Sequence, residues 1–299
     1  MNENGFTLPS FAKINWNLRV LGKRADGFHE LCTVFQTVSL HDNLTFAQAN
    51  DLTLICDLEK IPTDKTNLII KAANVLREKF KITTGAKIHL EKNIPAPGGL
   101  GGGSSNAAIA LLGLRKLWKL EISLEELHEI GKNLGSDVPL FLYGGTLLGT
   151  GRGTEIIELD DIEEQNLLIV TPSVDVPTGE AFQRLNAPRL TNFDSKSILK
   201  ICRNEASKLD LRQTELKNDF EASVFAIEPE IARVKRKLLE CGAVQALLSG
   251  SGASVFAVFD KQETRQATIK ALRNVKHWRM FAVATISRDQ YRATLEKVF

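Results

Sequence analysis

The sequence predicts an α+β protein of two domains, and three observations lead to this prediction. A chain of 299 residues is long enough for roughly two domains of ordinary size. Segments with alternating polarity and segments with helical periodicity follow one another along most of the chain. An acidic break at residues 160–165 separates the two halves, so we expect domains at 1–163 and 164–299.

The first half is predicted to combine strands with three helices. A Ser123 capping box opens one helix, and Gly135 ends it. His41 and Asp42 are expected to form a tight turn between two strands. The expected strands cover residues 11–21, 33–40, 43–46, 52–56, 86–91 and a glycine-punctuated hairpin over 144–159, and the expected helices cover 67–80, about 107–118 and 124–134.

The second half alternates between strand and helix patterns, which suggests a ferredoxin-like arrangement. A glycine turn at residues 250–253 joins two of its short strands. The expected strands cover residues 167–171, 246–249, 254–259 and 279–286, and the expected helices cover 178–182, 195–202, 219–227, 228–241 and 261–274.

Composition excludes several classes of protein. Lys and Arg number 38 against 36 Asp and Glu, a net charge of +2, so no global field draws the chain to nucleic acid or anionic lipid. Four scattered cysteines without CxxC spacing argue against a disulfide framework and a zinc site. We see neither a signal peptide nor an apolar run of the ~20 residues that a membrane helix needs. A reducing, cytoplasmic setting is therefore expected.

The stretch 94–114, IPAPGGLGGGSSNAAIALLGL, is the most informative part of the sequence. Dense glycine is kept where backbone bends unusually or approaches a ligand closely. Ser104, Ser105 and Asn106 are candidates for the N-cap of the helix that follows. The free N–H groups at the start of a helix favour an anion, and phosphate is the expected one. Neither of the common nucleotide-binding motifs GxxxxGK[ST] and GxGxxG fits the stretch. The alternative to an anion site is a flexible glycine linker before an ordinary helix.

These residues resemble a known family. Pro95 with the following GGLGGGSSNAA resembles the phosphate-binding motif of the GHMP kinase superfamily. The longer strings EKNIPAPGGLGGGSSNAA and FAKINWNLRVLGKRADGFHEL are similar to the branch that acts on a cytidine diphosphate derivative of methylerythritol, in the non-mevalonate isoprenoid pathway. The resemblance covers nearly the whole chain in separate blocks. Pro97 departs from the pattern, and Phe28 stands where the family frequently has tyrosine.

The resemblance implies the GHMP kinase fold, with a ribosomal S5 domain 2-like, ATP-binding N-terminal domain and a ferredoxin-like, substrate-binding C-terminal domain. It implies phosphoryl transfer from ATP, with Mg²⁺, to the 2-hydroxyl of that small molecule. No nucleic-acid or membrane partner is implied. The metal ligands and the oligomeric state stay open.

The resemblance also assigns site residues. Lys13 in AKIN and Asp137 in SDVPLF would be catalytic, with Asp137 as general base and Lys13 beside it. From the pattern alone, Lys13 is a residue on the wet face of a strand, and a helix cap explains Asp137 equally well. Ser104 or Ser105 is the natural hydroxyl beside magnesium.

Further positions would contact the two substrates. Asn15 would lie by the erythritol part, Phe28 and Phe182 would flank the cytosine, His29 would meet its edge, and Thr178 would lie nearby. The turn at 250–253 would fold back towards the glycine loop. The nucleotide would be held by Asn67, Leu68 and Lys92 near adenine and ribose, and by Pro95, Gly98, Gly99, Leu100, Gly101, Gly102, Gly103, Ser104, Ser105 and Asn106 at the phosphates.

Two alternatives remain open at this stage. One is another GHMP kinase with a mevalonate- or homoserine-type substrate, although such substrates carry no base for two aromatic rings to stack on. The other is a nucleic-acid-binding module, because the first domain's fold type resembles that of a ribosomal protein. Backbone affinity for nucleic acid depends on clustered Lys and Arg, which a near-neutral chain does not supply.

Overall fold

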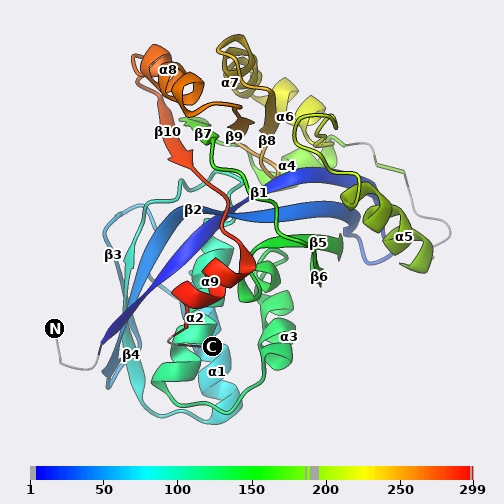
Figure 1. Ribbon diagram of the computed structural model, residues 1–299. Coiled ribbons are helices and arrows are strands. Elements are labelled where there is room, and N and C mark those ends of the chain that lie inside the picture. Colours follow the sequence, from blue (N-terminus) through cyan, green and yellow to red (C-terminus); the bar gives the residue numbers. More distant parts are fainter. Residues whose placement is uncertain (1–4, 186, 189–194, 297, 299) are drawn as a thin grey trace.

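The computed structural model describes residues 5–185, 187–188, 195–296 and 298. Two β-sheets with helices on their outer faces organise the described chain (Figure 1). The first sheet has the order β3-β4-β2-β5-β6, with β1 paired to β2. Its strands are β1 (Phe6–Lys23), β2 (His29–Ala49), β3 (Thr53–Cys56), β4 (Gly85–Glu91), β5 (Thr146–Gly151) and β6 (Glu155–Glu158).

Helices α1 (Leu68–Phe80), α2 (Gly102–Leu117) and α3 (Leu124–Leu134) cover one face of this sheet (Figure 1). Helix α2 lies at the centre of the first hydrophobic cluster, and its residues from 105 to 114 are all buried. The predicted capping box at Ser123 is present, and Gly135 ends α3 as expected. A short 3-10 turn, η1 (Pro139–Leu142), follows α3 and packs against α2.

The second sheet is antiparallel with the order β10-β7-β9-β8. It consists of β7 (Leu167–Pro172), β8 (Gln245–Leu248), β9 (Val255–Val258) and β10 (Trp278–Val283). The helices between β7 and β10 are α4 (Thr178–Gln183), α5 (Ser195–Ala206), α6 (Glu221–Ile227), α7 (Pro229–Glu240) and α8 (Gln262–Leu272). The predicted α+β class is confirmed, and the four strands of the second half lie close to their expected positions.

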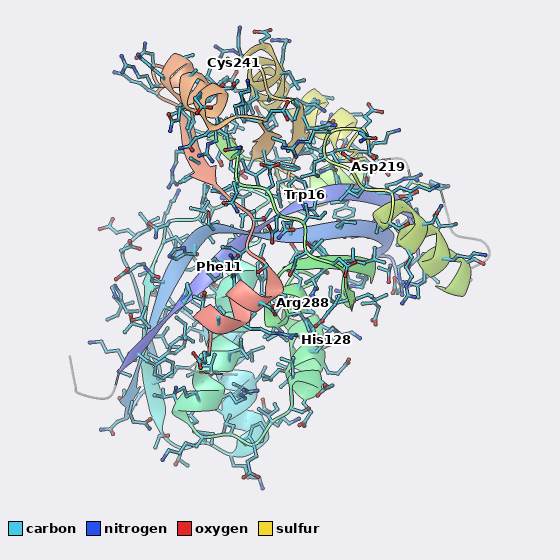
Figure 2. All side chains as sticks on the ribbon, viewed as in Figure 1. Phe11, Trp16, His128, Asp219, Cys241 and Arg288 are labelled. Carbon is cyan, nitrogen blue, oxygen red and sulfur yellow. A yellow bond between two sulfur atoms is a disulfide. The ribbon has the colours of Figure 1, made fainter. Side chains whose placement is uncertain are left out.

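Strands β1 and β2 contribute to the hydrophobic core under the helices of the first half and to the core against the second sheet. Apolar residues of α7 pack on one face of the second sheet, and residues of β1 and β2 pack on the other. Trp16 of β1 lies in this interface with its ring 5.4 Å from that of Phe256, edge to face (Figure 2). The long hairpin is therefore shared by both hydrophobic layers.

The predicted turn at His41 and Asp42 is wrong, because β2 continues through both residues. The pairing of β1 with β2 shifts register between Phe11 and Ala12, which makes a β-bulge at this point. Asp42 is fully buried, and its carboxylate accepts hydrogen bonds from the backbone N–H groups of Asn93 and Ile94. An acidic residue can therefore lie inside the strand, because the neighbouring segment at residues 93–94 donates hydrogen bonds to its carboxylate.

Two further expectations need correction. No helix was predicted after β10, whereas α9 (Arg288–Thr294) follows it and begins with a Ser287–Gln290 capping box. The scattered cysteines argued against a disulfide framework, and this prediction fails for one pair: Cys32 of β2 and Cys202 of α5 are joined, with Cα atoms 5.7 Å apart. Sequence spacing fails here because 170 residues separate the two cysteines. No helix among the described residues has the length and apolar character needed to cross a membrane.

Candidate active site

The glycine loop between β4 and α2 packs closely against Ser249 and Phe141. Gly99 and Gly101 have φ values of +70° and +71°, which L side chains rarely adopt. A Cβ at Gly99 would lie 2.1 Å from the Ser249 carbonyl oxygen, and one at Gly101 would lie 2.8 Å from the Phe141 ring. A Cβ at Gly103 would meet no atom within 4 Å. Packing therefore requires glycine at Gly99 and Gly101 but not at Gly103.

The predicted N-cap is wrong. Gly101 is the N-cap of α2, and a glycine has no side chain to bond the N–H groups at the start of the helix. Ser104, Ser105 and Asn106 lie inside the first turns instead. Glycine is tolerated at a cap, and uncapped N–H groups at a helix start are donors for an anion. The expectation of an anion site at this point therefore gains a structural basis.

Three residues predicted to contact the nucleotide have their side chains in a buried polar network. Lys92 Nζ and Asn106 Nδ2 donate to Asp42 Oδ2 at 2.7 and 2.9 Å. Ser105 Oγ accepts from Ser10 Oγ at 2.7 Å. Burial lowers the pKa of Lys92, and the charge of Asp42 opposes this shift. The network ties the end of β4 to α2, so it supports the glycine loop from within.

Lys13, Asn15 and Asp137 form the centre of the candidate site. Lys13 Nζ donates to Asn15 Oδ1 at 2.8 Å and lies 3.6 Å from Asp137 Oδ2. Lys13 is buried, and this desolvation lowers the pKa of its ammonium group, while the carboxylate of Asp137 acts in the opposite direction. The N-cap of η1 is Val138 without a side-chain bond. The helix-cap interpretation of Asp137 therefore finds no support.

These groups open into a cavity of about 340 Å³, here named the phosphate cavity. Ser104 borders the phosphate cavity, whereas Ser105 is buried. The predicted return of the second half is confirmed: Ser249 Oγ donates to the Gly99 carbonyl at 3.0 Å. The lining residues include Lys13, Asn15, Pro97, Gly98, Gly99, Gly101, Ser104, Asp137, Thr178, Phe182 and Gly250.

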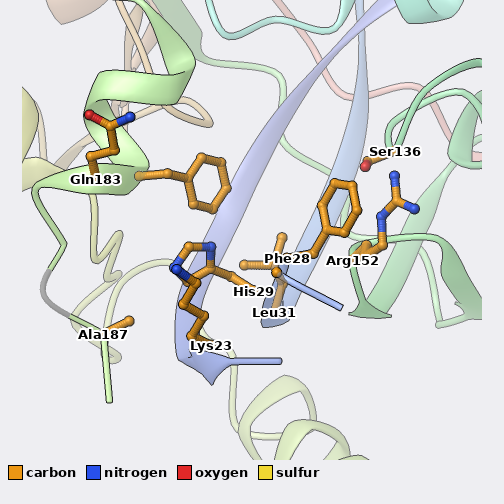
Figure 3. Close-up of a pocket in the computed structure, with 10 residues that line it drawn as sticks. Lys23, Phe28, His29, Leu31, Ser136, Arg152, Gln183 and Ala187 are labelled. Atoms are coloured by element: carbon orange, nitrogen blue, oxygen red, sulfur yellow. The ribbon is translucent and has the colours of Figure 1, made fainter. Parts of the chain in front are cut away.

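A second cavity of about 570 Å³, the base cavity, adjoins the first and is lined by Phe28 and His29 (Figure 3). Phe182 lines it as well. His29 stacks on Phe182 with ring centroids 4.9 Å apart. The Arg152 guanidinium carbon lies 3.7 Å from the centroid of the Phe28 ring. Burial, and then the charge of Lys23, lower the pKa of His29, which favours the neutral form of its ring. The structure thus brings together all three side chains expected to meet a base.

The remaining predicted residues lie outside both cavities. Asn67 caps α1, where its Oδ1 accepts from the Ile69 N–H at 2.9 Å and its Nδ2 donates to the Pro62 carbonyl at 2.6 Å. Its neighbour Leu68 is half-buried. Leu100 is buried, and its carbonyl accepts from the Lys13 N–H at 2.9 Å. Pro95 is also buried. Their predicted contacts with nucleotide stay predictions.

The two polar residues that border both cavities, Ser136 and Arg152, were not predicted from the sequence. Ser136 directly precedes Asp137 and was noted only as part of its motif. Arg152 stands between Gly151 and Gly153, in a stretch interpreted only as a hairpin turn. An arginine between two glycines in a turn could have been predicted to be a binding residue.

The comparisons with known proteins agree with this geometry. The family model of the GHMP kinases N terminal domain matches residues 67–145, and that of the GHMP kinases C terminal matches 196–277. A 4-diphosphocytidyl-2-C-methyl-D-erythritol kinase from Solibacter usitatus is 39% identical over 96% of this chain and 90% of its own. The equally named protein of Thermodesulfovibrio yellowstonii is 38% identical over 88% of this chain and 93% of its own.

Solved structures point the same way. A crystal structure of 4-(cytidine 5'-diphospho)-2C-methyl-D-erythritol kinase matches with a TM-score of 0.75 and 29% identity, over 94% of this chain and 99% of that one. A homoserine kinase from Cytophaga hutchinsonii, at 20% identity and a TM-score of 0.68 over 96% of this chain and 98% of that one, shares the fold. From the two family models, the relatives and the site geometry together, the chain belongs to the GHMP kinase family, and within it to the 4-diphosphocytidyl-2-C-methyl-D-erythritol kinases.

Proposed function

We propose that this protein transfers the γ-phosphoryl group of ATP to the 2-hydroxyl of 4-diphosphocytidyl-2-C-methyl-D-erythritol. One observation carries the proposal: the Lys13–Asp137 pair opens into the same cavity as the glycine loop, and that cavity adjoins an aromatic base cavity. A kinase of mevalonate or homoserine has no use for the base cavity, because its substrate contains no ring to stack.

In the proposed reaction, Asp137 Oδ2 accepts the proton of the hydroxyl as its oxygen bonds to the γ-phosphorus. The bond from that phosphorus to the bridging oxygen breaks, and ADP leaves. The Lys13 ammonium lies 3.6 Å from Asp137 Oδ2 and offsets negative charge on the transferring oxygens. Asn15 keeps the ammonium in place, because its Oδ1 accepts from both Lys13 Nζ and the Gly250 N–H, at 2.8 and 3.0 Å.

The start of α2 suits the phosphates of ATP, because its N–H groups are uncapped and Gly103 leaves open space above them. Magnesium fits the donors that border the phosphate cavity, since it binds through one or two oxygen ligands and the phosphates, and keeps several waters. The Ser104 hydroxyl would hold the ion together with the phosphates, and the ion would offset charge on the transferring phosphoryl group. Ser105 is not proposed, because its hydroxyl lies in the buried network.

The two halves of the chain would share these tasks. We propose that residues 1–163 bind ATP and that 164–299 complete the substrate site through Thr178 and Phe182. Stacking of a base on an aromatic ring contributes about 1–3 kcal/mol, whichever base it is. The neutral ring of His29 offers one donor and one acceptor, which adds selectivity. We therefore expect cytidine to be preferred over uridine by more than an order of magnitude.

The test is to incubate the protein with ATP and a panel of alcohols that includes the cytidine diphosphate derivative, mevalonate and homoserine. ADP release identifies the substrate, and phosphorus NMR of the product identifies the hydroxyl that was phosphorylated. Turnover of mevalonate or homoserine as fast as the cytidine derivative would contradict the proposal. So would equal inhibition by cytidine and uridine nucleotides.

A further inference from the structure

The base cavity and the phosphate cavity share a wall. Four described residues line both: Leu31, Ser136, Arg152 and Phe182. A substrate with its base in one cavity and its reacting hydroxyl in the other must extend past the residues that line both cavities. A nucleoside diphosphate derivative carries its two phosphates between the base and the alcohol. Its anionic part therefore passes Arg152, the one charged residue of the four.

Arg152 is placed to receive an anion. It follows β5 at the tip of the β5–β6 hairpin, and its guanidinium lies over the Phe28 ring (Figure 3). Stacking on an aromatic ring restricts the guanidinium and leaves its edge free to donate hydrogen bonds. Within the described part of the chain, its buried Nε has no hydrogen-bond acceptor.

Four acidic side chains border one cavity together with Arg152, and each of them pairs with another cation. Asp26 and Glu30 form ion pairs with Arg24, and Glu129 and Glu155 form ion pairs with Lys132. The positive charge of Arg152 is therefore only partly offset by its surroundings. A buried donor without a partner and a cation at the junction of two cavities have a common explanation, which is an anionic ligand between the cavities.

We propose that Arg152 binds the diphosphate of the substrate and thereby selects nucleoside diphosphate derivatives over nucleosides. The inference rests on the proposed function. A guanidinium donates two parallel hydrogen bonds to phosphate oxygens, whereas a lysine acts as a point charge. Stacking on Phe28 fixes Arg152 before the substrate arrives, so less side-chain freedom is lost on binding.

The experiment compares CDP with cytidine as ligands, measured by calorimetry. In Arg152→Gln we expect the affinity for CDP to fall about tenfold to a hundredfold, as for the loss of hydrogen bonds to a charged group, while the affinity for cytidine is unchanged. Arg152→Lys should lose less for CDP than Arg152→Gln. Arg233→Gln is the matched control, because Arg233 also lies over an aromatic ring, 5.3 Å from Trp278, but borders neither cavity.

The outcomes separate the possibilities. Equal losses for CDP and cytidine would mean that Arg152 only supports the base cavity through Phe28, which overturns the proposal. An unchanged affinity for CDP would also overturn it. If the wild-type protein bound neither ligand, the proposed function would itself be wrong. Thermal unfolding checks that the variants fold, and if Arg152→Gln does not, a lower ratio of CDP to cytidine affinity in Arg152→Lys still decides the question.

Discussion

Lys13 shows how a single residue can be costly to the fold and necessary for the chemistry. Its ammonium is buried, and taking a charge out of water disfavours the charged form. Asn15 and Asp137 compensate in part, through a hydrogen bond and an ion pair. A side chain of this kind is kept for chemistry rather than for stability.

We therefore expect Lys13→Met to abolish turnover without lowering the free energy of unfolding, which should stay equal or rise by about 1 kcal/mol. Asp137 keeps a third of its side chain exposed, at 33%, so its charge stays solvated in the variant. Urea unfolding and an ADP-release assay measure the two quantities. A loss of stability above about 2 kcal/mol would instead assign the ammonium a structural role.

The lowered pKa of Lys13 also predicts a pH dependence. The folded protein gives up this proton below the usual pKa of 10.5, so activity that needs the ammonium falls as pH rises through the folded pKa. Between the folded and unfolded pKa values the unfolded chain binds more protons, so this group makes stability rise with pH. The pH profile of kcat/KM measures the effect. Lys13→Arg should move the alkaline limb to higher pH, and an unmoved limb would assign it to another group.

Asp137→Asn should lower turnover by about 100- to 10,000-fold, the usual effect of losing a general base, and leave ATP affinity nearly unchanged. The neutral amide keeps the shape of the side chain but cannot take the proton of the hydroxyl. Single-turnover kinetics and nucleotide titration measure the two effects. Asp289→Asn in the first turn of α9 is a suitable control. Retention of more than a tenth of the activity would demote Asp137 to a positioning role.

At the scale of elements, the glycine loop contains glycines kept for two different reasons, close packing and room for a ligand, which could not be distinguished in the sequence. Gly101 is required by packing, because a Cβ there would strike the Phe141 ring. Gly103 is free of such contact, and its position at the start of α2 leaves room for a ligand. We expect Gly103→Ala to keep the free energy of unfolding and to weaken ATP binding by about tenfold, since a methyl group would lie where phosphate must approach.

The matched variant is Gly101→Ala, which should lose stability by more than about 1 kcal/mol because of its positive φ and the blocked space. Nucleotide titration and thermal unfolding of both variants make the comparison. If Gly103→Ala bound ATP as tightly as the wild type, the phosphates would have to lie away from the start of α2.

Local patterns predicted most elements, because caps, turns and polarity periods depend on neighbours in sequence. They failed where a partner distant in sequence decides the structure. The turn expected at Asp42 is strand because Lys92 and Asn106 satisfy the carboxylate from another part of the chain. Ser104 and Ser105 looked equivalent in sequence, and Ser10 decides between them by hydrogen-bonding to Ser105. The omission of α9 is different, since its capping box was legible in the sequence.

At the scale of the whole molecule, the C-terminal helix returns to support the first half (Figure 1). Tyr291 of α9 is fully buried, and its hydroxyl donates to the Phe141 carbonyl of η1. A Cβ at Gly144 would lie 2.3 Å from the Tyr291 ring. The Phe141 ring in turn lies beneath Gly101 of the glycine loop. A path of direct contacts therefore connects the end of the chain to the phosphate cavity.

We expect Tyr291→Ala to lower the free energy of unfolding by about 3–5 kcal/mol, as other large aromatic truncations do. Because the cavity it leaves lies against Phe141, ATP affinity should fall as well. Tyr291→Phe should lose only a hydrogen bond, about 0.5–1.5 kcal/mol, and keep ATP affinity. Leu238→Ala in α7 is the control, since Leu238 is buried in a hydrophobic cluster that includes no described residue of the glycine loop. Urea unfolding and nucleotide titration at a temperature where all variants are folded give both quantities. Equal effects of Tyr291→Ala and Leu238→Ala on ATP affinity would show that general loosening, and not this path of contacts, couples α9 to the site.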